Sequence, residues 1–158
     1  MTARVIRPVT PDLPGVITRH KYQPPPWVAE HLTPTAYNNW LRGKAQGLAR
    51  RDEQRGGHYS VSEAKAAVHA AIADCGGRDY WTGEQLRWDL LGNYDSDESG
   101  LQGATYKRAR ALQPTIDHRD SRPICDFVIC AWRTNDAKHD MSSEELKEFC
   151  RLVLEHNP

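Results

Sequence analysis

Apolar side chains recur with a helical period in several stretches of the chain. The clearest pattern lies between Ser60 and Cys75, where the spacing of three and four residues is typical of one buried helical face. Ser60 and Glu63 form a capping box at its start, and Gly76-Gly77 provides a stop at its end. The pattern therefore predicts a helix, and its apolar face consists of Val61, Ala64, Val68, Ala71, Ile72 and Cys75.

Two further helices flank this one in the pattern. Thr33-Pro34 is typical of an N-cap and first helical residue, which predicts a helix running to about Asp52. Its apolar stripe is Tyr37, Trp40, Leu41 and Leu48, and its other face carries Arg42, Lys44, Arg50 and Arg51. A last helix begins at Ser142, where Glu145 completes a second capping box. We expect this last helix to bury Leu146, Phe149, Cys150 and Val153.

The segment between these helices has short strand and turn patterns. Residues 112–118 and 127–129 predict two strands, and a helix carrying Asn135 follows them. Upstream, residues 80–86 indicate a short hairpin or turn, residues 95–100 an acidic loop, and residues 106–112 a short helix. Strand, loop, strand and helix over 112–138 would make a compact ββα unit.

These elements predict an α+β fold with one domain. Residues 1–32 are rich in proline, including Pro24-Pro25-Pro26, and have no period, so we expect an extended N-terminal arm. Residues 33–158 would form the domain, with a helical portion at 33–77, the ββα core at about 112–138 and a C-terminal helix at 142–156. A chain of 158 residues is long enough for one core and too short for two ordinary domains.

Composition narrows the class of protein. Apolar residues are 39% and charged residues 27%, which is typical of a globular chain. The sequence lacks an apolar run of the roughly 18 residues that a membrane span needs, and it lacks a signal-peptide core, so we expect a cytoplasmic protein. In that compartment its four cysteines would be reduced thiols and not a disulfide framework.

Charge is distributed unevenly along the chain. The net charge is zero, but residues 1–58 hold nine Lys and Arg against four Asp and Glu, whereas residues 59–158 hold twelve against seventeen. An acidic half can carry metal ligands while a basic half contacts phosphate. A solvated surface with uneven charge explains the same counts.

One cluster of residues indicates specific chemistry. Asp117 and His118 end the first predicted strand, and Asn135 follows seventeen residues after His118. Asp and Asn oxygens are the ligands that a hard divalent cation prefers, and a neutral imidazole beside them can deprotonate water. The alternative is that Asp117 and His118 merely pair within the fold.

The segment from about Tyr80 to Val153, slightly under half of the chain, resembles HNH endonucleases of the His-Me finger (ββα-metal) superfamily. The similar motifs occur in the family's order and spacing. They are Trp81-Thr82-Gly83-Glu84-Gln85-Leu86, Thr115-Ile116-Asp117-His118, the run from Ile129 to Lys138, and Asp140-Met141-Ser142-Ser143-Glu144-Glu145-Leu146.

This resemblance implies a metal-dependent endonuclease that hydrolyses DNA phosphodiester bonds, leaving 5′-phosphate and 3′-hydroxyl ends. It assigns His118 as general base and Asp117 and Asn135 as ligands of one divalent ion, Mg²⁺ or Mn²⁺. The family's middle Asn corresponds to Asp126, whose ionised side chain can accept hydrogen bonds but cannot donate them. The paired Cys-x-x-Cys knuckles of many relatives are missing here, so we expect no structural zinc.

Double-stranded DNA is the favoured partner. Candidate phosphate contacts are Arg119 and Arg122 after the base, Arg133 near Asn135, and Arg42, Lys44, Arg50 and Arg51 on the first long helix. A catalytically weak or inactive nucleic-acid-binding protein with the same fold is the alternative function, with Asp126 as the suspected lesion. A small structural protein is a third interpretation.

Overall fold

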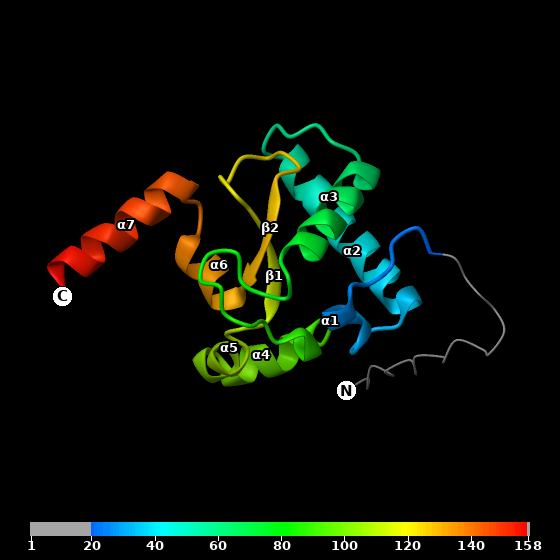
Figure 1. The fold of residues 1–158 in the computed structure, drawn as a ribbon, viewed down its shortest axis with the longest axis horizontal. Coiled ribbons are helices and arrows are strands. Elements are labelled where there is room, and N and C mark those ends of the chain that lie inside the picture. Colours follow the sequence, from blue (N-terminus) through cyan, green and yellow to red (C-terminus); the bar gives the residue numbers. More distant parts are fainter. Residues whose placement is uncertain (1–19, 158) are drawn as a thin grey trace.

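A computed structural model describes residues 20–157, and it is an α+β structure (Figure 1). Within that range, seven α-helices and one 3-10 turn surround a two-stranded antiparallel sheet. None of the helices in residues 20–157 is both long enough and apolar enough to cross a membrane. The first nineteen residues of the predicted arm lie outside the described residues. Residues 20–32 pack on the body, where Tyr22 and Val28 join the core and α1 spans Pro26–Ala29.

The predicted N-terminal helices are confirmed. Helix α2 spans Pro34–Glu53 and α3 spans Val61–Asp74. Thr33 caps α2 by accepting the Ala36 N–H at 3.2 Å, and Ser60 and Glu63 form the capping box that starts α3. The two helices pack against each other through their apolar faces, because burying those faces is what stabilises amphipathic helices. The buried residues of the pair include Tyr37, Leu41, Leu48, Ala64, Val68 and Ile72.

The two strands form a hairpin at the centre of the molecule. Strand β1 spans Pro114–His118 and β2 spans Phe127–Ala131, with Asp117 opposite Val128 and His118 opposite Phe127. All five residues of β2 are buried. Helix α3 packs on β2, and α6, which spans Trp132–Lys138, contacts both strands (Figure 1). Strand, loop, strand and helix thus follow one another as predicted, and the last two residues of β1 are Asp117 and His118.

The acidic segment before the hairpin differs from its prediction. Residues 95–100 were expected to be a loop, but Ser96–Gln102 form helix α4. The reason is local, because the Asp95 carboxylate accepts the Asp97 and Glu98 N–H groups and acidic residues are favourable in a first turn. Helix α5 spans Ala104–Ala109, so it begins and ends before the predicted 106–112. The 3-10 turn η1 covers Trp88–Leu90, and an isolated bridge between Arg78 and Gln85 closes the predicted turn at 80–86.

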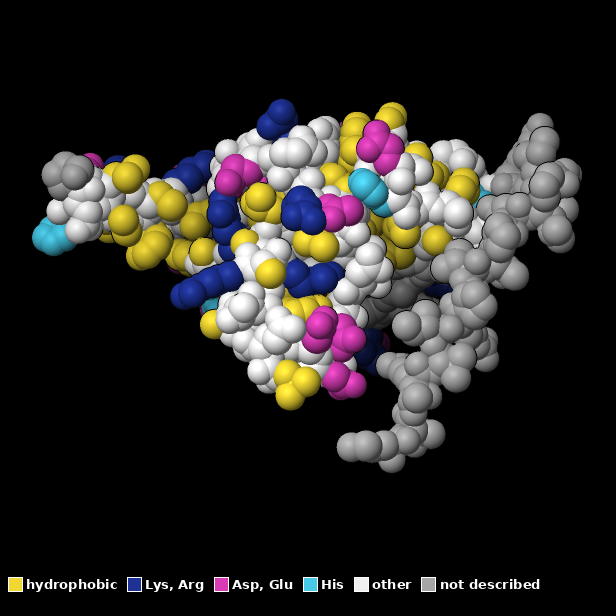
Figure 2. Space-filling view, turned by 90° about the horizontal axis from the view of Figure 1, so that it is seen from below, with side chains coloured by type: hydrophobic (Ala, Val, Ile, Leu, Met, Phe, Trp, Pro, Cys, Tyr) yellow, Lys and Arg dark blue, Asp and Glu magenta, His cyan; other side chains and the backbone are white. Residues whose placement is uncertain are grey.

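The prediction that the last helix buries its apolar residues is wrong for three of the four, since only Leu146 is partly buried. Helix α7 spans Ser143–His156 with the expected Ser142–Glu145 capping box, but it projects away from the body (Figure 1). Phe149, Cys150 and Val153 are exposed, and hydrophobic side chains cover the projecting arm in Figure 2. Local interactions support the helix instead of packing, since Arg151 pairs with Glu148 and Glu155 along one face. All four cysteines of the chain are free thiols.

Candidate active site

A cavity of about 690 Å³ lies where the end of β1 meets the ends of α2 and α6. Strand β1 contributes Asp117 and His118, α6 contributes Asn135, and Arg51 and Arg55 come from the end of α2 and the residues after it. The structure therefore brings together the predicted general base, both predicted metal ligands and one of the predicted basic residues.

His118 is held in a defined orientation. Its side chain is buried, its ring lies 4.9 Å from the Phe127 ring between centroids, and its Nε2 lies 2.6 Å from Oδ2 of Asp52. Because an ionised carboxylate can only accept, this contact places the hydrogen on Nε2 and leaves the Nδ1 lone pair unprotonated. Burial lowers the pKa of His118 below its ordinary value, although the charge and hydrogen bond of Asp52 oppose that shift. Burial thus favours the neutral ring, which is the form that can accept a proton.

Asp52 was not predicted from the sequence, and it is the residue that orients His118. It lies near the C-terminal end of α2, 66 residues before His118, and is fully buried. Its carboxylate also accepts hydrogen bonds from the Tyr59 hydroxyl and, at 3.3 Å, from Arg55. One signal could have identified it: Asp52 continues the spacing of Leu41, Ala45 and Leu48, so it places a carboxylate on the buried face of a helix.

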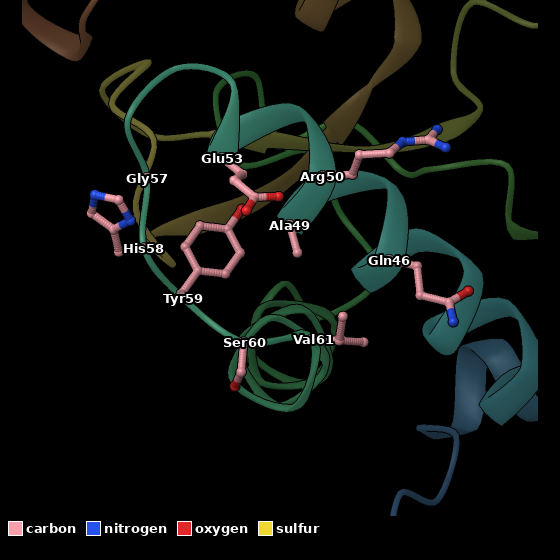
Figure 3. A pocket seen from close by; sticks show the side chains of 9 residues that line it. All are labelled: Gln46, Ala49, Arg50, Glu53, Gly57, His58, Tyr59, Ser60 and Val61. Carbon is pink, nitrogen blue, oxygen red and sulfur yellow. The ribbon is translucent and has the colours of Figure 1, made fainter.

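Tyr59 connects this carboxylate to a second pocket, of about 410 Å³, between α2 and the start of α3. Figure 3 shows its ring pointing from the loop before α3 toward the last turns of α2. Burial, with the hydrogen bond to Asp52, raises the pKa of the Tyr59 phenol above its ordinary value. Tyr59 therefore stays a neutral donor that holds Asp52 in place.

Lys138 is a second site residue that sequence analysis missed. It is fully buried, and its ammonium donates to the His118 carbonyl at 2.9 Å and to Ser121 Oγ at 3.1 Å. The same nitrogen lies 3.0 Å from Asp117 Oδ2 as an ion pair. That oxygen is buried and has no well-aligned hydrogen bond among the described residues. Lys138 thus ties α6 to the end of β1 and sets the position of the Asp117 carboxylate.

Asn135 is positioned by its amide nitrogen. The nitrogen lies 3.2 Å from Thr115 Oγ1 and 3.5 Å from the Ile116 carbonyl, so it contacts the middle of β1. The side-chain carbonyl oxygen is therefore the atom that Asn135 offers to a cation. Residues 20–157 contain no cluster of three or more His, Cys, Asp or Glu side chains suited to a metal. The predicted ligands therefore offer one carboxylate and one amide oxygen. Asp136 and Asp140 also line the cavity, but they pair with Lys107 and His139.

Asp126 is not among the residues that line the cavity, and it contacts Arg119, the residue after His118. Its backbone carbonyl accepts the Arg119 N–H at 3.0 Å, and its carboxylate pairs with the Arg119 guanidinium at 3.1 Å. Arg119 also donates to the Tyr80 hydroxyl. Asp126 therefore fixes the start of the loop that follows the predicted base, and its carboxylate is already paired.

Apart from Arg51, which lines the cavity, the remaining predicted basic residues lie on separate surfaces. Arg122 pairs with Asp120 at 3.6 Å, and Arg133 pairs with Glu84. Arg42 is exposed and bonds Asn39. Arg50 lines the pocket of Figure 3, away from the cavity, whereas Lys44 and Arg51 line a groove beside β1.

Comparison of the chain with protein-family models, with curated proteins and with solved structures found no match in any of the three. What this site can do is therefore inferred from the chain's own residues.

Proposed function

We propose that the protein is a metal-dependent nuclease that hydrolyses DNA phosphodiester bonds, with His118 as general base. The observation that carries this proposal is the His118–Asp52 pair. A buried imidazole faces a carboxylate with Nε2, and its Nδ1 makes no hydrogen bond to residues 20–157, at a cavity that also contains Asp117 and Asn135. This is the arrangement that proton abstraction from water requires.

In the proposed step, Nδ1 of His118 removes a proton from a water molecule in the cavity. The water oxygen forms a bond to phosphorus while the bond from phosphorus to the 3′ oxygen breaks. The leaving oxygen takes a proton from solvent, and the products are a 5′-phosphate and a 3′-hydroxyl. Asp52 stabilises the imidazolium that forms, because its carboxylate faces the protonated Nε2 at 2.6 Å.

The donor set fits a small divalent cation such as Mg²⁺ or Mn²⁺. Asp117 has a buried carboxylate oxygen without a well-aligned hydrogen bond, and Asn135 offers an amide oxygen at the same cavity. Mg²⁺ takes few protein ligands and completes its shell with water and phosphate. These two residues would hold the ion, which when bound would neutralise charge on the phosphate and on the departing oxygen.

The basic residues at the cavity support a phosphate substrate. Arg51 and Arg55 line it with side chains that are 57% and 43% exposed, so their guanidinium groups are accessible. Arg55 is fixed by hydrogen bonds to Asp52 and to the Ser121 carbonyl. Two guanidinium groups beside a base and a cation site favour an anionic substrate with paired acceptor oxygens, such as the two non-bridging oxygens of a phosphate diester.

The test is plasmid cleavage by purified protein with Mg²⁺ or Mn²⁺, comparing His118→Ala with wild type. Loss of the general base should lower the rate by about 10² to 10⁴. His58→Ala is the matched control, because His58 is exposed in the pocket of Figure 3 and should cleave like wild type. Equal cleavage by the His118 variant would overturn the assignment.

A second function is favoured by one observation, the Lys138–Asp117 ion pair. This ammonium already supplies positive charge at the predicted ligand, which favours a protein that binds nucleic acid without turnover. A wild-type protein that shifts DNA in a gel in a salt-dependent way, with no cleavage at any Mn²⁺ concentration, would select this second function.

A further inference from the structure

A groove of about 400 Å³ runs beside the hairpin, next to the candidate active site. Helix α2 forms one wall, with Trp40, Lys44 and Arg51 along one face. Residues 113–116 form the other wall, which includes most of β1. Within the described residues β1 pairs with no strand but β2, and side chains of α6 contact the Ile116 and His118 carbonyls. The groove therefore lies between a helix and a strand edge.

Two glycines keep the helical wall open. Gly43 and Gly47 both line the groove, and a Cβ added to either would meet no atom within 4 Å. Glycine in a helix interior is unfavourable relative to alanine, and no close packing or positive φ requires glycine at either position. What the two glycines provide is space, which lets a ligand approach the backbone of α2.

The charge of the groove is positive. Lys44 and Arg51 lie in it, and no acidic side chain is among the described residues that line it. The Lys44 ammonium sits 5.9 Å from the centroid of the Trp40 ring, which holds this cation on the groove side of α2. Arg51 lines both the groove and the candidate active-site cavity. A chain of anionic groups could therefore run from the groove into the cavity and remain beside a cation along its whole path.

We propose that this groove binds a single, unpaired DNA strand that continues from the scissile phosphate. The proposal rests on the proposed function, and it specifies the substrate as DNA with a single-stranded segment beside the cleaved bond. A groove of this volume is in the range of small-ligand pockets and admits a few nucleotides but not a duplex. Lys44 and Arg51 are seven residues apart, about 10 Å along the helix, so a strand in the groove would contact both cations through different phosphates.

An extended acidic peptide added to the edge of β1 is the competing occupant. DNA is favoured because the two cations are on the helical wall and not along the strand edge, and because one of them is shared with the active-site cavity. A peptide held mainly by strand pairing would need no cation on α2.

The test fills the groove without disturbing the fold. Gly47→Leu places a side chain in the groove, and Gln46→Leu places the same side chain on the pocket of Figure 3 as a matched control. Both are made in the His118→Ala protein, so that DNA stays intact, and binding of a fluorescent twelve-nucleotide thymidine strand is followed by anisotropy. Gly47→Leu should weaken binding about tenfold or more while its Tm rises by about 2–4 °C. Gln46→Leu should bind as the parent does.

Salt dependence gives a second measurement. Lys44→Ala and Arg51→Ala should each flatten the slope of log K against log salt by about 0.7 for a single strand. Arg50→Ala is the control, since Arg50 lines the other pocket and should leave the slope unchanged. A blunt twelve-base-pair duplex should bind more weakly than the single strand, and Gly47→Leu should not affect it.

The outcomes separate this proposal from the proposed function. If wild type cleaves DNA while Gly47→Leu and Gln46→Leu bind the strand equally well, the groove proposal is overturned and the nuclease proposal stands. Strand binding that Gly47→Leu abolishes, in a wild-type protein that never cleaves, would support the groove and refute the nuclease. Displacement of the strand by a twelve-residue glutamate peptide that binds equally well to Lys44→Ala would assign the groove to peptide and overturn the proposal.

Discussion

Replacing Asp52 with asparagine tests the feature on which the proposed chemistry most depends. The substitution keeps the size of the side chain and removes its charge. In the structure one carboxylate oxygen accepts hydrogen bonds from both His118 and Tyr59, and the other faces Arg55. An amide can place either its oxygen or its NH₂ group toward His118. With the NH₂ group there, Nε2 must accept, the ring hydrogen moves to Nδ1, and the base is lost.

The cost in stability follows from these contacts. A hydrogen bond to a charged group contributes about 1.5–3 kcal/mol and a neutral one about 0.5–1.5 kcal/mol. Neutralising the acceptor of two such bonds should therefore lower the free energy of unfolding by about 2–3 kcal/mol. The ion pair with half-exposed Arg55 adds little, because surface pairs contribute about 0–1 kcal/mol. The Tm should fall by about 4–12 °C, and Asp52→Asn should remain folded at 25 °C.

The effect on catalysis should be larger than the effect on stability. We expect kcat for DNA cleavage to fall by about 10² to 10⁴, with KM changed by less than about threefold, because Asp52 acts through His118 and not on DNA. Plasmid cleavage at saturating Mn²⁺ measures both constants. Nitrogen-15 NMR of the His118 ring reports the tautomer directly and does not depend on activity. It should show the hydrogen on Nε2 in wild type.

Two control variants separate the effect of Asp52 on the orientation of His118 from its effect on the stability of the fold. Asp79 is another buried carboxylate, bonded to the N–H groups of Trp81, Thr82 and Ala131 outside the cavity. Asp79→Asn should lose comparable stability and keep wild-type kcat per folded molecule. Tyr59→Phe should cost about 1 kcal/mol and leave the His118–Asp52 bond in place, so cleavage should persist. A folded Asp52→Asn protein with kcat within about threefold of wild type would refute the role of Asp52.

Three further outcomes are expected. Asn135→Ala should weaken Mn²⁺ affinity about tenfold or more in a calorimetric titration, and an unchanged affinity would remove Asn135 from the ligand set. Lys138→Met should lower the free energy of unfolding by about 3–5 kcal/mol in urea, because it leaves a buried carboxylate unpaired. Lys147→Met should leave the free energy of unfolding nearly unchanged, because its pair with Glu144 is exposed. Equal costs for the two would show that the Lys138 pair is not structural. Burial raises the pKa of the Cys130 thiol to about 12, so an aromatic disulfide reagent at pH 8 should label exposed Cys150 rapidly and Cys130 only on unfolding. Fast native labelling of Cys130 would contradict its burial.

Local signals in the sequence were sufficient for most of the helices. Thr33, Ser60 and Ser142 cap the helices they were predicted to begin, because an N-cap hydrogen bond forms within three or four residues and needs no distant partner. The hairpin followed by α6 was predicted for the same reason, from β-branched and apolar runs over short distances. The acidic segment after Asp95 was misassigned because its composition is typical of loops, while its cap and first-turn charges stabilise a helix.

The tertiary structure decided which side chains are buried and which ionisable groups pair with one another. The apolar stripe of α7 has the period of a buried helix, yet periodicity identifies a face and not what covers it. In the described fold Phe149, Cys150 and Val153 of that stripe remain exposed. Asp52 and His118 are 66 residues apart, and no local pattern links a helix end to a strand end. No sequence pattern distinguishes Lys138 from other basic residues near helix ends. Its burial against Asp117 is visible only in the folded structure.

By itself, then, the sequence determined where the capped helices begin, where the hairpin lies and which residues carry ionisable chemistry, since these depend on near neighbours and residue type. Only the tertiary structure decided which of those ionisable groups meet. It gave His118 a carboxylate from α2, gave Asp117 an ammonium from α6, and separated Arg51 from Arg50 although they are adjacent in the chain. The physical reason is that pairing of buried charges depends on packing between distant elements, which local propensity does not specify.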